Sequence, residues 1–143
     1  MKALIVIVAL GLGVSCANAQ KMKETDVPAH VKATAFKEYP NIKVEKWEKE
    51  GGNYEAEFNV NKVETSVLID AGGNLIETEV EINVSALPKG VSEYVSKNLA
   101  GQKIKEASKI SDTKGTITYE AEINKVDYIF DVNGSFIKKV VEK

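Results

Sequence analysis

The sequence predicts an α+β protein in which two tandem units, each a helix followed by four antiparallel strands, form one continuous sheet with both helices on one face. Two observations lead to this fold class. After its first twenty or so residues, the chain repeats the same order of motifs with a period of about sixty residues. Each repeat opens with apolar residues at helical spacing and continues with the alternation of half-buried strands.

Composition limits the classes of function. The chain has 143 residues, of which 43% are hydrophobic and 28% are charged, as in an ordinary globular domain. Nineteen basic residues against twenty-one acidic ones give a net charge of -2, so no bulk positive charge favours nucleic acid. Every basic residue is lysine, and the planar guanidinium that reads phosphates and bases is missing. We therefore expect no nucleic-acid partner.

The first residues have the pattern of a signal peptide. Lys2 precedes an apolar run over residues 3–14, and Ala17 and Ala19 form a small-x-small cleavage site. As a helix the run would span about 18 Å, short of the roughly 30 Å hydrocarbon core of a membrane. We predict that residues 1–19 are a signal peptide without a transmembrane segment. The rest, residues 20–143, would be a single periplasmic or secreted domain made of two repeats, about 25–84 and 85–143.

Cys16 supports an alternative form of export. The segment Gly13-Val14-Ser15-Cys16 partly resembles a lipoprotein box, although that pattern prefers Leu where Gly13 stands. The alternative is therefore a lipoprotein anchored through Cys16. With release after Ala19, the chain would have no cysteine, which excludes disulfides and a catalytic thiol.

Each repeat begins with a predicted helix that carries one apolar stripe. The residues at positions i, i+4 and i+8 are Val31, Ala35 and Tyr39 in the first repeat and Val91, Val95 and Leu99 in the second. Pro28 and Pro88 stand at the start of these stripes, where a helix tolerates proline. Pro40 ends the first helix, and Gly101 ends the second.

The predicted strands follow in the same order in both repeats. An extended stretch at residues 41–50 or 102–112 leads to a glycine-bearing turn. The next stretches, 54–59 and 119–124, agree at five of six positions. Alternation places Tyr54, Ala56 and Phe58 on one face, and this face needs a helix to cover it. Later turns rich in glycine and asparagine predict hairpins.

This order resembles the PepSY-like proteins of the bacterial periplasm, a group also called β-lactamase-inhibitor-like because of its fold. The resemblance covers about residues 25–142 and rests on the Pro-led helix, the Tyr-Glu-Ala-Glu strand and the hairpin at 70–75 or 131–136. Trp47 also looks like the tryptophan of the family's first strand, whereas the second repeat has Ala107 there. The resemblance implies a non-enzymatic periplasmic protein. Calcium-linked regulation and inhibition of a partner enzyme are ideas attached to the group.

The two Asp-led turns are weak candidates for metal ligands. Asp70 and Asp131 could open a calcium loop, with Glu81 and Glu142 at the twelfth position. The glycine required at the sixth position is instead Leu75 in the first loop and Phe136 in the second. We therefore predict hairpin turns in which the aspartate accepts backbone hydrogen bonds. His30, the only histidine, is predicted to be an exposed helix residue without catalytic partners.

Glutamates form the main candidate site. If Thr78, Val80 and Ile82 face the helices, alternation sends a set of carboxylates to the opposite face. The set is Glu55, Glu57, Glu77, Glu79, Glu81, Glu120 and Glu122. One interpretation is a solvated face that lysines balance on neighbouring strands: Lys43, Lys49, Lys105 and Lys138. The other is a face for a basic partner or for weakly bound Ca²⁺.

Trp47 bears on this choice. Alternation from Val44 places it away from the helices, where an exposed tryptophan is a typical binding anchor, although a β-bulge would turn it inward. We therefore expect a non-enzymatic exported binding or regulatory module that uses an open acidic sheet face toward an exported protein or peptide. The alternative is an inhibitor of an exported enzyme that acts through hairpin loops. A hydrolase is disfavoured, because nothing in the sequence suggests a pocket that raises the pKa of one carboxyl group.

Overall fold

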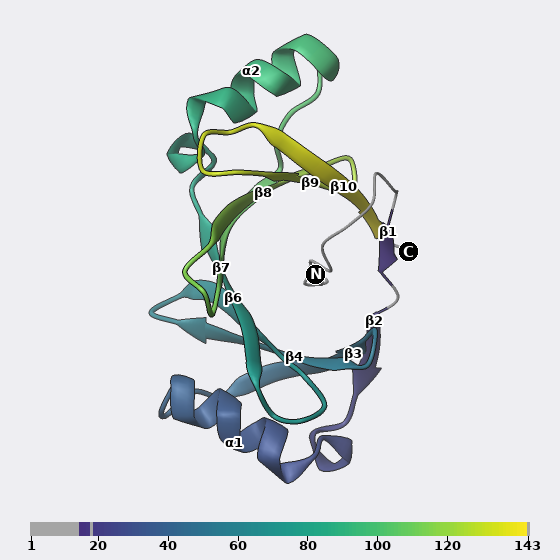
Figure 1. Cartoon of the computed structure of the whole chain (residues 1–143), viewed down its shortest axis with the longest axis vertical. Helices are drawn as coiled ribbons and strands as arrows, with labels where there is room; N and C mark the ends of the chain where they lie inside the picture. The colour runs from purple at the N-terminus through teal and green to yellow at the C-terminus, as the bar shows by residue number, and fades with distance from the viewer. Residues whose placement is uncertain (1–14, 18, 143) are drawn as a thin grey trace.

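A computed structural model of the chain describes residues 15–17 and 19–142, so most of the predicted signal peptide lies outside the described residues. One ten-stranded sheet runs in the order β1-β10-β9-β8-β7-β6-β5-β4-β3-β2. Every neighbouring pair is antiparallel except β1 and β10, which are parallel. Both helices lie on the outer side of the curved sheet (Figure 1). The predicted α+β fold is confirmed.

The two units have the predicted element order. The first contains α1 (Ala29–Glu38), β3 (Val44–Glu50), β4 (Asn53–Val60), β5 (Val63–Ile69) and β6 (Leu75–Ile82). The second contains α2 (Lys89–Asn98), β7 (Glu106–Asp112), β8 (Ile117–Ile123), β9 (Val126–Phe130) and β10 (Phe136–Glu142). β6 pairs with β7 from Glu77 opposite Asp112 to Ile82 opposite Ala107, and this pairing makes the sheet continuous.

Each helix covers its own apolar cluster on the outer face of the sheet. In the first unit Val31 and Ala35 of α1 are buried against Phe58, and the rings of Tyr39 and Phe58 lie 4.9 Å apart. In the second unit Val91 and Val95 of α2 pack with buried residues of β8 and β9. Burial of this apolar area is the main term that holds each helix on the sheet.

Two short strands precede the first unit and were not predicted. β1 (Ser15–Ala17) pairs with the end of β10, and β2 (Ala19–Met22) pairs with β3. A chain that begins at Gln20 would keep most of β2 and lose β1. A chain that begins at Cys16 would keep the pairing of Cys16 with Val141. Removal of residues 1–19 would therefore uncover the edge of β10 that β1 pairs with.

The contact between helix and hairpin differs in the two units. In the first, exposed His30 donates a hydrogen bond from Nε2 to the carbonyl oxygen of Ala71 at 2.8 Å. In the second, Gly90 occupies the position of His30, and a Cβ atom there would lie 2.6 Å from the carbonyl oxygen of Asn133. The backbone of α2 thus rests directly on the β9–β10 turn, where Gly134 has a positive φ of 81°.

This contact gives the first prediction. Gly90→Ala should lower the free energy of unfolding by about 1–3 kcal/mol, because the added methyl group meets backbone atoms that cannot move aside. The sign is diagnostic, since alanine at a helical position normally stabilises by up to about 1 kcal/mol relative to glycine. Urea unfolding measures the change, with Ser96→Ala on exposed α2 surface as the control. A more stable Gly90→Ala variant would contradict the close approach.

Candidate functional site

Strand register places the predicted glutamates on the face that the helices do not cover. Residues directly opposite one another in adjacent strands share a face. One such row runs from Glu55 through Leu68 and Glu77 to Asp112. A second runs from Glu57 through Ser66 and Glu79 to Ile110. The sheet curls toward this side, which we call the concave face (Figure 1).

The remaining three glutamates lie on the same face. Glu81 is opposite Ser108, which is opposite Glu120, and Glu122 is opposite Asp127. Further along the Glu120 row, Ile129 is opposite Lys138 of β10. The period-2 prediction for all seven glutamates is therefore confirmed as a statement about which face they occupy.

The expectation that this face is open is wrong for most of its members. Glu55, Glu77, Glu79, Glu120 and Glu122 are each at most 5% exposed. Glu57 is half-buried, and Glu81 is exposed. The reason is the curvature of the sheet, which directs side chains on the concave side toward one another. Alternation predicts the face of a residue, but it carries no information about that curvature.

Lysines balance part of the negative charge of these glutamates. Not every lysine predicted to do so lies near them. Lys46 Nζ lies 3.0 Å from Glu48 and 3.1 Å from Glu57. Burial lowers the pKa of Lys46, but the hydrogen bonds to these two carboxylates outweigh it and the net shift is upward. Lys105 precedes β7 rather than lying within a strand, and its Nζ lies 3.3 Å from Glu122, so it balances a glutamate as predicted.

Lys49 does not belong to the concave face. It pairs in register with Tyr54, whose side chain packs beneath α1, and its Nζ lies 5.5 Å from the centre of the Tyr54 ring. The interpretation of Lys49 as a balancing charge among the glutamates is therefore wrong. Lys43 is exposed and precedes β3.

Trp47 is not the exposed anchor that alternation predicted. It is 3% exposed, pairs in register with Ala56, and belongs to the apolar cluster beneath α1. The register of β3 shifts between Val44 and Lys46, so an extra residue there turns Trp47 to the helix side. A binding role on the concave face is therefore excluded for the Trp47 side chain in this fold.

The second prediction follows from this burial. Trp47→Ala should lower the free energy of unfolding by about 3–5 kcal/mol, since it removes a large side chain from a packed core. Trp47→Phe should cost clearly less, because Trp47 Nε1 has no hydrogen-bond partner to lose among the described residues. Thermal and urea unfolding of both variants tests the point. A Trp47→Ala variant as stable as the native chain would mean that Trp47 is exposed after all.

The Asp-led turns are hairpin turns, as predicted. Asp70 Oδ1 accepts a hydrogen bond from the backbone N–H of Asn74 at 2.9 Å. Asp131 Oδ1 accepts hydrogen bonds from the backbone of Asn133 at 2.8 Å and of Ser135 at 2.9 Å. Within residues 15–17 and 19–142, no group of three or more His, Cys, Asp or Glu side chains is arranged to hold a metal ion. Calcium binding stays a prediction.

Glu77 has a strongly perturbed environment on the concave face. Burial, followed by repulsion from Glu79, raises its pKa from 4.5 to about 8, while attraction to Lys138 opposes the shift. Asp112 and Glu50 add further repulsion. Burial also lowers the pKa of Lys138, against the opposing effect of Glu77. No pattern in the sequence indicated this raised pKa of Glu77.

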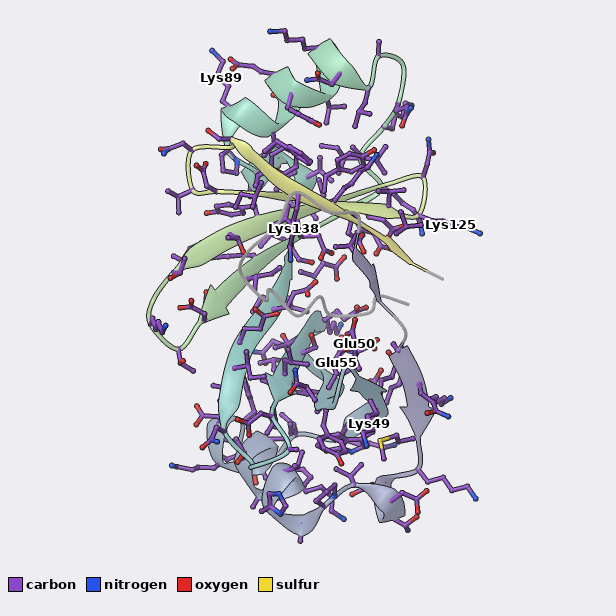
Figure 2. The ribbon with its side chains drawn as sticks, turned by 45° about the vertical axis from the view of Figure 1, so that its right-hand side comes forward. Lys49, Glu50, Glu55, Lys89, Lys125 and Lys138 are labelled. Atoms are coloured by element: carbon purple, nitrogen blue, oxygen red, sulfur yellow. The ribbon has the colours of Figure 1, made fainter. Side chains whose placement is uncertain are left out.

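These groups come from both units. Figure 2 shows Lys138 of β10 and Glu50 and Glu55 of the first unit directed into the space that the sheet encloses. Lys89 and Lys125, by contrast, point outward into solvent. The curved sheet thus brings opposite charges from distant strands into one interior, where electrostatic interactions are stronger than in water.

The third prediction is a pH dependence of stability. Between about pH 4.5 and 8, the folded chain keeps a proton on Glu77 that the unfolded chain has released, so the free energy of unfolding falls as pH rises. At roughly 1.4 kcal/mol per pKa unit, the shift of Glu77 corresponds to a loss of unfolding free energy of at most about 5 kcal/mol across this pH range. Local relaxation around Glu77 makes the loss smaller. We expect Glu77→Gln to stabilise the chain at pH 8 by about 1–3 kcal/mol and to flatten the profile.

Urea unfolding from pH 5 to pH 9 measures this profile. Glu81→Gln, at an exposed position of the same strand, is the matched control and should leave the slope unchanged. A Glu77→Gln profile parallel to that of the native chain would show that Glu77 ionises normally.

Comparisons with known proteins agree with the repeat and the fold. Two solved structures share the fold: a DUF2874 family protein from Bacteroides uniformis (20% identity, TM-score 0.67, covering 79% of this chain and 88% of that one) and a BLIP-like protein from Bacteroides fragilis (24%, 0.56, 78% and 84%). A third, from Bacteroides eggerthii, is described as "putative periplasmic proteins" (14%, 0.67, 79% and 87%). No curated protein matches the sequence.

At these identities the solved structures establish the fold alone. No helix in the part of the chain that the structure describes is long and apolar enough to cross a membrane. The family described as "Putative beta-lactamase-inhibitor-like, PepSY-like" matches the sequence twice, over residues 14–77 and 70–138, in correspondence with the two units. Because these matches span most of the sequence, the chain belongs to the PepSY-like, β-lactamase-inhibitor-like family.

Proposed function

We propose that this chain is a non-enzymatic exported binding module of the periplasm that holds a basic segment of a partner polypeptide against its concave face. One observation carries the proposal. Five carboxylates converge on a small pocket of that face, and one of them, Glu57, is paired with Lys46. The five are Glu55, Glu57, Glu64, Glu79 and Glu81.

The carboxylates differ in what they can contribute. Glu81 is exposed and Glu64 is half-buried, so both can meet a partner directly. Glu55 and Glu79 are buried and add to the negative potential rather than to contacts. Neighbouring like charges on a sheet are unfavourable, and a cationic partner relieves that repulsion. This argues for a basic partner, whose attraction would weaken with salt.

The fourth prediction tests this proposal by neutralising the accessible acids. Glu64→Gln combined with Glu81→Gln should weaken binding of a fluorescent pentalysine peptide several-fold at low salt. The matched control combines Glu24→Gln with Glu38→Gln, which makes the same change in net charge at exposed positions around α1. Fluorescence anisotropy measures Kd at two salt concentrations. Equal weakening in both double variants, or no binding by the native chain at low salt, would contradict the proposal.

Weak calcium binding to the same carboxylates would have a different signature. Millimolar Ca²⁺ would then raise the melting temperature and displace pentalysine, because a ligand that binds the folded chain stabilises it by mass action. Potassium chloride at equal ionic strength separates this effect from screening.

A second candidate is inhibition of an exported enzyme through a hairpin. The observation that favours it is the apolar exposure around the β9–β10 turn, where Val132 is 55% and Ile137 is 45% exposed. Apolar loop residues of this kind fill pockets on partner proteins. Partner binding would then depend on Val132 and Ile137 and would survive the loss of Glu64 and Glu81.

A further inference from the structure

A second pocket lies on the concave side, where β6, β7 and β8 meet. Its volume is about 360 Å³, within the range of small-ligand sites. Leu75, Ile76 and Ile110 supply apolar wall, and Glu77 and Asp112 supply carboxyl groups. This pocket shares no lining residue with the acidic pocket that contains Glu81. It combines an apolar wall with carboxyl groups.

Glu77 is the feature of this pocket that folding alone does not explain. Its side chain lines the pocket and is 3% exposed, yet Oε1 has no hydrogen-bond partner among the described residues. Lys138 is near enough to lower the pKa of Glu77, but it makes no hydrogen bond to this oxygen. A buried polar atom without a partner costs about 1–3 kcal/mol. Oε1 itself is covered in this fold, so a ligand in the pocket that displaces the atoms around it would supply the missing partner.

Asp112 adds a second carboxyl group at the same place. It stands directly opposite Glu77 in the antiparallel pairing of β6 and β7. Its Oδ1 accepts hydrogen bonds from the backbone N–H groups of Thr116 and Lys114, each at 2.8 Å, and these bonds lower its pKa. Two carboxylates directly opposite each other are unfavourable unless one is protonated or a cation lies between them.

We propose that this pocket binds an alkylammonium group, with the ammonium between Glu77 and Asp112 and the alkyl chain against Leu75, Ile76 and Ile110. The ammonium donates hydrogen bonds, which suits carboxylate oxygens, and its alkyl stem suits the apolar wall. Two sources share this chemistry: a lysine side chain of the basic partner, in which case the inference rests on the proposed function, and a free alkylamine.

The neighbouring charges set the pH dependence of this binding. Glu79, Asp112 and Glu50 favour a cation near Glu77, whereas Lys138 and, at the pocket lining, Lys114 oppose it. In the empty pocket Glu77 is largely protonated at pH 7, so an ammonium must displace that proton. Binding should therefore release a proton at pH 7 and tighten several-fold between pH 6 and pH 8.5, below the pKa of an alkylamine.

The fifth prediction uses calorimetry with three probes: n-butylamine, Nα-acetyl-lysine amide and the uncharged Nα,Nε-diacetyl-lysine amide. We expect the two amines to bind in the millimolar range and the diacetylated probe to bind at least tenfold more weakly. Titrations in two buffers of different ionisation enthalpy count the released protons. A lysine derivative that binds more tightly than butylamine assigns the pocket to a partner side chain, and the reverse order assigns it to a free amine.

Two variants test whether the amines bind in this pocket. Glu77→Gln, which we expect to fold at least as stably as the native chain, should lose at least tenfold in affinity for both amines. Glu38→Gln, at an exposed position of α1 that belongs to neither pocket, should keep it. No saturable binding by either amine, or binding that Glu77→Gln leaves unchanged, overturns the inference. Amine binding in a chain that does not bind pentalysine would contradict the proposed function alone.

Discussion

The curvature of the sheet toward its helix-free side is the constraint on which the charged interior depends. The two apolar clusters that α1 and α2 cover lie on the outer face of the sheet. Alternation then sends every intervening side chain to the other face, and curvature brings those side chains together. Glu77 of β6 thereby comes within electrostatic reach of Glu50 of β3 and Lys138 of β10. A flat sheet would have left the same residues as separate solvated charges.

Local sequence patterns predicted those features of the fold that depend only on local geometry. The helical stripes, the strand order and the face of all seven glutamates follow from periodicity within a few residues, and all agree with the structure. Burial of those glutamates depends on the curvature of the whole sheet, which no short window contains. β1 was missed because residues 15–17 lie in the predicted signal peptide, whose composition says nothing about pairing with a distant β10. β2, which pairs with β3, is only four residues long.

The error at Trp47 had a signal in the sequence. Val44 and Trp47 are three positions apart, and a regular strand cannot put both on the same face. Either one apolar residue is exposed or the strand contains an extra residue. The bulge between Val44 and Lys46 is the second solution, and it buries both residues against the core beneath α1. Burying a tryptophan outweighs the loss of one regular pair in the ladder.

The two repeats share their architecture but not their chemistry. His30 of α1 contacts its hairpin through a side chain, whereas Gly90 of α2 allows backbone contact. The repeat equivalent of Glu77 is Lys138, so an acidic and a basic residue stand at matching positions, and each shifts the pKa of the other across the interior. Divergence at one position of the repeat has thus produced an electrostatic pair between the units.

The burial of Glu77 is less well compensated by a neighbouring lysine than that of Glu57 or Glu122. Lys46 lies between Glu48 and Glu57, and Lys105 lies beside Glu122, so these charges have partners at hydrogen-bond distance. Glu77 has only the more distant Lys138, and it stands opposite Asp112. A neutral side chain there would make the fold more stable. A residue that costs stability inside a pocket is what a binding site requires, because the missing partner is then supplied by the ligand.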